Sequence, residues 1–303
     1  MFRLLIIFLA GLNIFASKLV LLNSDNIHIH YPEKRMELAR FIARTVRNRL
    51  PEMEKIFGKT DTPIQIYVAE TQSDFRKMAG VHLPDWSAAV TIYPKRIIVL
   101  KNPLLTQSSL HEFREIVEHE FVHLYQSLHV PLNITPVWFN EGFAQYISTP
   151  YNIQGRILLS RALVNNQLIP MSKLADVLGY RHQKAALAYA ESASIVEFLI
   201  VVYGENIISE MFSDIQKTRD FEKSFRNILG IGLSDFEHQW KKYVARRYRW
   251  LFLLDIQYII WLIIPLLVIV VYFIKGHRNK EIIQQWNTEE IAMKADIECK
   301  KPI

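Results

Sequence analysis

The feature that most constrains this chain is an uncharged apolar run near its end, from Ile256 to Ile274. As a helix, its 19 residues would come close to the roughly 30 Å of a bilayer's hydrocarbon core. Tyr258, Trp261 and Tyr272 lie toward its ends, where interfacial aromatic residues concentrate in membrane helices. The run therefore predicts a single transmembrane helix over residues 256–274, and the lipid bilayer as a partner.

A second apolar segment opens the chain. Arg3 precedes a short apolar run, and the small residues Ala16 and Ser17 follow it. This is the pattern of a secretory signal peptide over residues 1–16, although an uncleaved N-terminal anchor is the alternative. Together the two segments predict a domain outside the cytosol, one span, and a cytoplasmic tail over residues 275–303.

Basic residues flank the predicted span on both sides. Five lie within residues 241–249 and three within residues 275–280, so the positive-inside rule alone would favour the opposite orientation. Because that rule weakens when a long domain is translocated, the signal peptide decides the orientation. We expect the protein in the cell membrane, single-pass, with its domain on the periplasmic or extracellular side and the preceding basic run at the lipid headgroups.

The remaining composition is that of an ordinary globular domain. Half of the 303 residues are apolar and 22% are charged, which excludes a disordered chain, and the single Cys excludes a disulfide scaffold. The net charge of +6 comes with no aromatic interleaving or fold signal for nucleic acid, so no nucleic-acid partner is expected.

Strand patterns come first along the chain and helix patterns afterwards. The alternation of apolar residues predicts strands at residues 27–30, 64–69, 88–93 and 96–100, the last two as a hairpin. Helical spacing predicts helices from Pro32 toward Gly58, at 74–78, from Ser109 to about 127, from Thr135–Pro136, at about 185–203, and after Ser234. Two of these begin at capping boxes, Ser109 with Glu112 and Ser234 with Glu237. This order predicts an α+β fold with a sheet part over residues 17–105 and a helical part over 106–250.

The most informative stretch is His119-Glu120-Phe121-Val122-His123. Residues four apart lie on one face of a helix, so His119 and His123 can present imidazoles to one metal ion. Glu120 lies about 100° around the helix, where it can reach a water on the metal without binding the metal itself. The alternative is a surface helix that happens to carry two histidines.

A third ligand is available on the next predicted helix. Glu141 follows His123 by seventeen intervening residues and stands among large apolar neighbours. A carboxylate directed into a core needs a partner, and a cation is the economical one. Gly142 next to it leaves room for a close backbone approach. We therefore predict one Zn²⁺ held by His119, His123 and Glu141, against the alternative of an exposed Glu.

This pair of motifs resembles a known family. HExxH followed by Trp-Phe-Asn-Glu-Gly-Phe-Ala (residues 138–144) is similar to the gluzincin metallopeptidases, specifically the peptidase MA-like domain related to aminopeptidase N. The resemblance extends from about Ile64 to Tyr243 and implies a zincin-like fold. The spacer between the two motifs is one residue shorter than in aminopeptidase N.

The resemblance also implies roles for the site residues. Glu120 would act as the general base on a zinc-activated water, and Tyr189 matches the family's tyrosine that stabilises the oxyanion. His182, shortly before the same helix, is the other candidate donor. A tyrosine before an apolar helix more often serves packing, so the role of Tyr189 rests on the resemblance.

The predicted activity is hydrolysis of peptide bonds in a peptide or protein substrate. An extended peptide could add a strand beside Ala88 and Ala89. Aminopeptidase N relatives carry there a Gly-Ala-Met-Glu-Asn block whose Glu holds the substrate's free amine, and this chain has none. An endopeptidase is therefore favoured. The competing hypothesis is a catalytically silent zincin-fold membrane protein that binds a partner or peptide, but such a module would not need Glu120.

Overall fold

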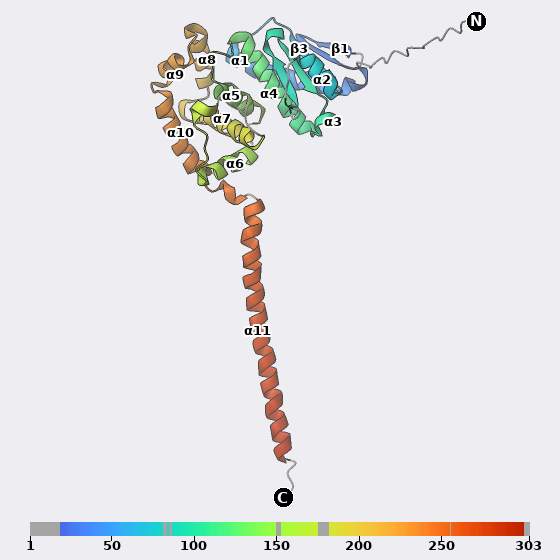
Figure 1. Cartoon of the computed structure of the whole chain (residues 1–303), viewed down its shortest axis with the longest axis vertical. Helices are drawn as coiled ribbons and strands as arrows, with labels where there is room; N and C mark the ends of the chain where they lie inside the picture. Colours follow the sequence, from blue (N-terminus) through green and yellow to red (C-terminus); the bar gives the residue numbers. More distant parts are fainter. Residues whose placement is uncertain are drawn as a thin grey trace, which may run out of the picture.

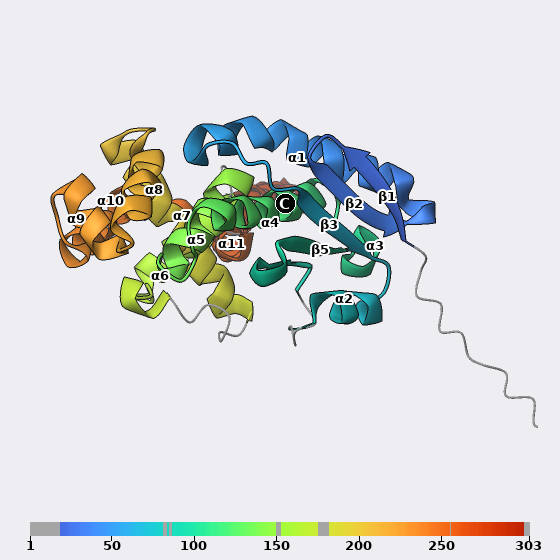
Figure 2. The same ribbon diagram turned by 90° about the horizontal axis from the view of Figure 1, so that it is seen from above.

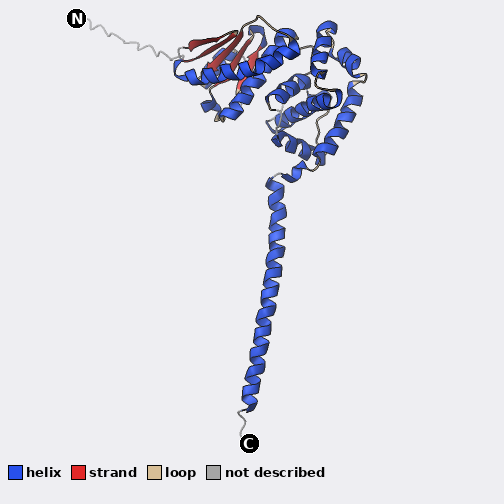
Figure 3. Cartoon of the chain, turned by 180° about the vertical axis from the view of Figure 1, so that it is seen from behind, coloured by secondary structure: helices blue, strands red, loops and turns tan. Residues whose placement is uncertain are grey.

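The computed structural model describes residues 19–80, 84, 87–149, 153–174, 182–254 and 256–299. Strands gather at one end of the folded domain, and helices make up the regular structure described at the other end (Figure 3). A single long helix runs away from the domain toward the C-terminus (Figure 1). The arrangement confirms the predicted α+β class. The predicted signal peptide lies outside the described residues.

The described strands form one mixed five-stranded sheet in the order β1-β2-β3-β5-β4. Strands β2, β3 and β5 are parallel neighbours, whereas β1 and β4 pair antiparallel at the two edges. The strands span Leu19–Ser24, Ile27–Pro32, Ile64–Ala69, Ala89–Ile92 and Ile97–Lys101 for β1 to β5. Four of them match the expected segments, and β4 and β5 form the expected hairpin. Strand β1 was not predicted.

Helices cover both faces of the sheet (Figure 2). Helices α1 (Met36–Phe57) and α4 (Leu110–His129) pack on one face, where Ile64, Ile66 and Val68 of β3 join the main hydrophobic core. Helix α2 (Gln72–Ala79) covers the other face through Phe75, which packs on Val99. Side chains along each strand point alternately to the two faces of the sheet, so helices can pack on both. The sheet part therefore has three layers, and α4 lies on the face that joins the main hydrophobic core.

Helix α4 begins as the sequence predicts. The Ser109 side chain accepts a hydrogen bond from the Glu112 N–H, and the Glu112 carboxylate accepts one from the Ser109 N–H, which completes the capping box. After the short helix α3 (Pro103–Thr106), α4 is the first element of the helical part. It contacts both the sheet and helix α5 (Val137–Ser148), so it joins the two parts of the domain.

Helix α5 lies against helix α7 (His182–Tyr203) at very short range. A Cβ added to Gly142 would stand 2.3 Å from the carbonyl oxygen of Ser192, a separation that real Cβ atoms essentially never show. The close approach predicted for this glycine is therefore present. It brings the two helix backbones together directly beside Glu141.

The remaining helices of the domain pack together in its helical part. They are α6 (Ile153–Val164), α8 (Ile207–Thr218), α9 (Phe221–Leu229) and α10 (Leu233–Tyr248). The predicted capping box at Ser234 is wrong, since α10 begins at Leu233 after Gly232 and has no side-chain cap. Glu237 instead forms an ion pair with Lys241 at 2.7 Å and accepts the Met171 N–H at 3.4 Å. The Glu237 carboxylate thus has one partner on its own helix and one from a distant segment, and neither is the cap position.

Helix α11 runs from Ile256 to Cys299 and contains Pro265. It includes the predicted span, but it continues through the segment predicted as a separate tail. Two described helices are long and apolar enough to cross a membrane: residues 184–203 within α7 and residues 259–291 within α11. Half of the α7 window is buried inside the domain, as in a core helix, whereas none of the α11 window is buried.

Candidate metal site

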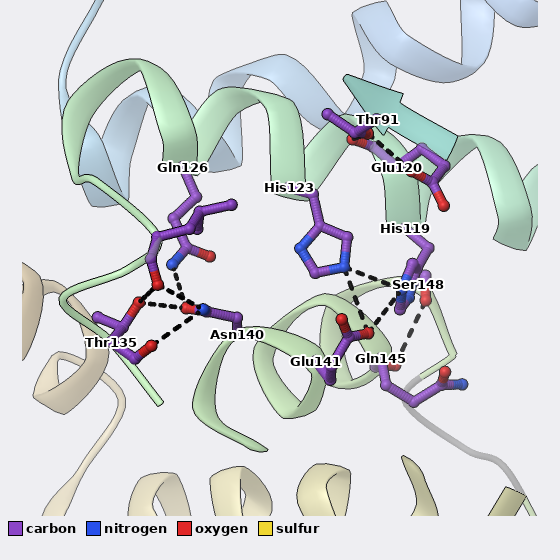
Figure 4. A network of polar contacts seen from close by, with 11 residues as sticks. Thr91, His119, Glu120, His123, Gln126, Thr135, Asn140, Glu141, Gln145 and Ser148 are labelled. Carbon is purple, nitrogen blue, oxygen red and sulfur yellow. Dashed lines mark hydrogen bonds and ion pairs between the residues drawn. The ribbon is translucent and has the colours of Figure 1, made fainter. Parts of the chain in front are cut away.

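The two histidines and Glu141 converge between α4 and α5 (Figure 4). His119 Nε2 and His123 Nε2 lie 3.1 Å apart, and each lies 3.4 Å from Glu141 Oε2. The side chains are 17%, 5% and 18% exposed, respectively, so the cluster is largely shielded but reachable. Among the described residues, no other group of three or more His, Cys, Asp or Glu side chains is arranged to hold a metal ion.

These separations fit tetrahedral zinc. Zinc binds imidazole nitrogen and carboxylate oxygen at roughly 2.0–2.2 Å. Two ligand atoms at tetrahedral angles are then about 3.3–3.5 Å apart, close to the 3.1–3.4 Å found between the three donors. Two neutral imidazoles with one carboxylate is also a donor set that catalytic zinc sites use, with the fourth position left open.

Electrostatics within the cluster favour an ionised carboxylate. Burial alone would raise the pKa of Glu141, but the charges of His123 and His119 and their hydrogen bonds outweigh it and hold the pKa well below its usual range. Burial would lower the pKa of His123, yet Glu141 reverses this and raises it. The ionised Glu141 carboxylate therefore favours a positive charge beside it.

Glu120 points away from the three donors toward strand β4 (Figure 4). The Thr91 hydroxyl lies 2.7 Å from Glu120 Oε2 and 3.1 Å from the backbone oxygen of the same residue. Thr91 is itself buried, so the bond is held in a fixed geometry. The sequence reasoning missed Thr91, because nothing in the motif indicates which strand lies beside the helix.

Two tyrosines line the pocket around the cluster. The ring of Tyr189, from α7, makes an edge contact with His119 at 6.4 Å between centroids. Tyr93 follows strand β4 and was not predicted. Desolvation in the pocket raises the pKa of each phenol, although Tyr93 remains 41% exposed, and the charges of Glu120 and Glu141 raise it further. Both therefore remain protonated donors at neutral pH. The side chain of His182, the other candidate donor, lies outside the described residues.

The donors open into a pocket of about 590 Å³, within the range of small-molecule and peptide sites. One wall is the β4 segment with Ala88 and Ala89, and the opposite wall comes from α5 and α7. Strand β4 is the edge of the sheet on this side. The predicted substrate residues thus lie in the same pocket as the predicted metal ligands.

Hydrogen bonds behind the site fix the turn between α4 and α5. The Asn140 amide oxygen accepts hydrogen bonds from the Gln126 amide at 2.6 Å and from the Thr135 hydroxyl at 2.5 Å. Asn140 directly precedes Glu141, so this buried network sets the position of the carboxylate ligand. On the outer side of α4, the Arg49 guanidinium pairs with Glu118 and ties the helix to α1.

The other histidine pair of the sequence has ordinary partners. His28 Nδ1 and His30 Nε2 both lie within hydrogen-bond distance of the Gln65 side chain, at 3.1 and 3.0 Å. His30 also stacks on Tyr67 with centroids 4.2 Å apart. A half-exposed strand face explains these residues, and they belong to no metal cluster among the described residues.

A known family matches the region of the chain that contains this site. Residues 47–246 match the peptidase MA superfamily, and this is about two thirds of the chain. The matched region includes α4, α5 and α7, which carry the three donors, Glu120 and Tyr189. The chain belongs to the peptidase MA superfamily.

One curated relative is similar over part of the chain. It is the uncharacterized protein YhcO of Bacillus subtilis (strain 168), which is 27% identical over 136 residues. The match covers 44% of this chain and 39% of that protein.

Proposed function

We propose that the protein is a membrane-anchored zinc metallopeptidase of the gluzincin type that binds one zinc ion through His119, His123 and Glu141. The observation that carries the proposal is the spacing of the three donor atoms, at 3.1–3.4 Å from one another, in a pocket that Glu120 also lines. A binding module would require the donors but would not need a further carboxylate, Glu120, in the lining of the same pocket.

The proposed chemistry assigns each residue a task. Zinc at this site would polarise the scissile carbonyl and lower the pKa of an attacking water. Glu120 takes the proton of that water and passes it to the leaving amine. The hydroxyl of Thr91 holds the Glu120 carboxylate in place. Tyr189 donates a hydrogen bond to the carbonyl oxygen as negative charge develops on it, and Tyr93 is a second phenol within the same pocket.

The substrate is proposed to bind as an additional strand beside β4. This strand is at the edge of the sheet and borders the pocket, and such an edge offers backbone groups to an extended peptide. Ala88 and Ala89 have small side chains that leave the edge accessible. Because the chain lacks the acidic block that holds a free amine in aminopeptidase N relatives, we favour cleavage within chains over removal of terminal residues.

Helix α11 is proposed to span the membrane. The side chains described within the apolar window are exposed, including Leu266, Val268 and Phe273 at 56%, 63% and 69%. A continuous apolar surface of this length is stable in lipid but not in water. We place the domain on the non-cytoplasmic side, in accordance with the predicted signal peptide, with the basic residues of α10 close to the headgroups.

The experiment combines metal analysis with a peptide digest of the full chain in detergent. We expect about one zinc per chain, cleavage of a mixed peptide library, and loss of cleavage on treatment with a chelator. Glu120→Gln should retain the zinc and lose turnover, whereas Glu210→Gln, at an exposed position of α8, should retain both. Cleavage that survives Glu120→Gln contradicts the mechanism. Zinc without any cleavage by the wild-type chain supports a silent binding protein instead.

A further inference from the structure

A second pocket adjoins the metal site on the side of α6. It has a volume of about 330 Å³ and lies between α5, α6 and α7. Gln145, Thr149 and Tyr189 line both this pocket and the one that contains the metal donors. The two spaces thus meet at a shared wall, which includes the tyrosine proposed to contact the scissile carbonyl.

The walls of the second pocket are mostly apolar. Helix α7 contributes Ala190 and Ala193, which share one helical face and have side chains too short to fill the space. Leu158 and Leu159 of α6 form the opposite wall. Since protein interiors are normally close-packed, an apolar space of this size beside a catalytic centre calls for an occupant.

The polar end of the pocket holds one ion pair between lining residues, Arg156 and Glu197. Glu197 pairs with Arg156 at 3.4 Å and lies 3.9 Å from Arg247, and it accepts a hydrogen bond from the Tyr248 hydroxyl at 2.8 Å. Of these two arginines only Arg156 lines the pocket, so the lining carries one cation and one carboxylate. The pocket therefore has no uncompensated negative charge to attract Lys or Arg, and its remaining lining favours an uncharged side chain.

We propose that this pocket selects the substrate, by taking a large apolar side chain such as Leu, Met or Phe from a residue next to the scissile bond. The inference rests on the proposed peptidase function and names its substrate class. A peptide paired with β4 directs alternate side chains to opposite sides. Because Gln145, Thr149 and Tyr189 line both pockets, a side chain directed at this shared wall would enter the second pocket. Burial of a Leu or Phe side chain there supplies the affinity.

The first measurement is a positional peptide library digested by the zinc-loaded full chain. We expect Leu, Met or Phe at one position to raise kcat/KM about 10-fold or more over Ala, the range that apolar pockets reach. Ala193→Leu and Ala190→Leu should fill the pocket and shift the preference toward Ala or Gly. Ala193→Ser keeps the volume nearly unchanged and serves as the matched control, so it should retain the wild-type preference.

A binding measurement separates the pocket from turnover. In the Glu120→Gln background, a blocked peptide with Leu at the preferred position should bind about 10-fold more tightly than its Ala analogue, and Ala193→Leu should remove this difference. Cleavage or binding without a preference for large apolar side chains overturns the pocket assignment and leaves the peptidase proposal intact. Absence of cleavage with a preserved binding preference overturns the peptidase proposal instead.

Discussion

The contact between α5 and α7 at Gly142 makes a quantitative prediction for Gly142→Ala. The new Cβ would lie 2.3 Å from the Ser192 carbonyl oxygen and 2.6 Å from its carbonyl carbon, where at least about 3.0 Å is needed. The two helices must therefore separate by about 0.7 Å, or α5 must rotate. Both obstacles are backbone atoms of α7, so no side-chain rotation can relieve the clash.

The free-energy cost can be worked from these contacts. Overpacking costs about 1–3 kcal/mol, and because the obstacles are backbone atoms the upper part of that range applies, about 2–3 kcal/mol. The better helix propensity of Ala returns about 1 kcal/mol. We expect a net loss of about 1–2 kcal/mol, which lowers the Tm by roughly 2–8 °C for a domain of this size. Because Glu141 precedes Gly142 on the same helix, zinc affinity should fall as well.

The assay is thermal unfolding of the chelator-treated full chain in detergent, followed by a zinc titration. Gly276→Ala is the matched control, since it adds the same methyl group to a helix position with nothing within 4 Å. The control should unfold at or above the wild-type temperature. An unchanged or raised Tm for Gly142→Ala, with unchanged zinc affinity, would refute the reasoning.

Three further predictions concern individual side chains. Thr91→Val removes the 2.7 Å hydrogen bond to Glu120 and should lower kcat by about 10-fold at unchanged zinc content, while Thr91→Ser should retain activity; equal kcat in all three proteins would contradict this role. Tyr189→Phe should lower kcat by about 100-fold or more if Tyr189 is the oxyanion donor, and Tyr93→Phe should have a smaller effect; the reverse order in steady-state kinetics would assign the role to Tyr93. Burial raises the pKa of Glu191 to about 8, so the folded chain retains a proton that the unfolded chain releases from about pH 4.5 upward. Its unfolding free energy should then fall as pH rises from about 4.5 to 8, by up to about 1.4 kcal/mol per unit, and Tm measurements across this interval should show that Glu191→Gln removes the fall.

The parts of the site that depend on local spacing could be predicted from the sequence. His119 and His123 lie one helical turn apart, so a correctly placed α4 suffices to bring their nitrogens within 3.1 Å of each other. The glycine at position 142 predicts a close backbone approach, and in the structure the approaching group is the backbone of Ser192. The α+β class followed from the order of strand and helix patterns, and the hairpin of β4 and β5 followed from alternation around a proline.

The parts that depend on tertiary neighbours could not be predicted. Thr91 and Tyr93 reach the site because β4 is the edge strand beside α4, and no local pattern states the strand order. Their spacing of two residues, which puts both on one face of a strand, is the only signal that could have suggested a joint role. At Ser234 the local capping pattern is present, but the Glu237 carboxylate instead accepts the Met171 N–H from a distant segment and pairs with Lys241 one turn along its own helix.

Metal binding and proton transfer at this site depend on two separate sets of contacts, which act as two supports. The position of Glu141 depends on the close contact between α5 and α7 and on the hydrogen bonds of Asn140. The position of Glu120 depends on its hydrogen bond from Thr91 of β4. Helix α4 contacts both supports and carries both histidines. A substitution at Gly142 should therefore weaken metal binding, and a saturating zinc concentration should restore turnover. A substitution at Thr91 should lower turnover, and no zinc concentration should restore it. A common response of both variants to zinc would mean that the two supports are mechanically coupled through α4.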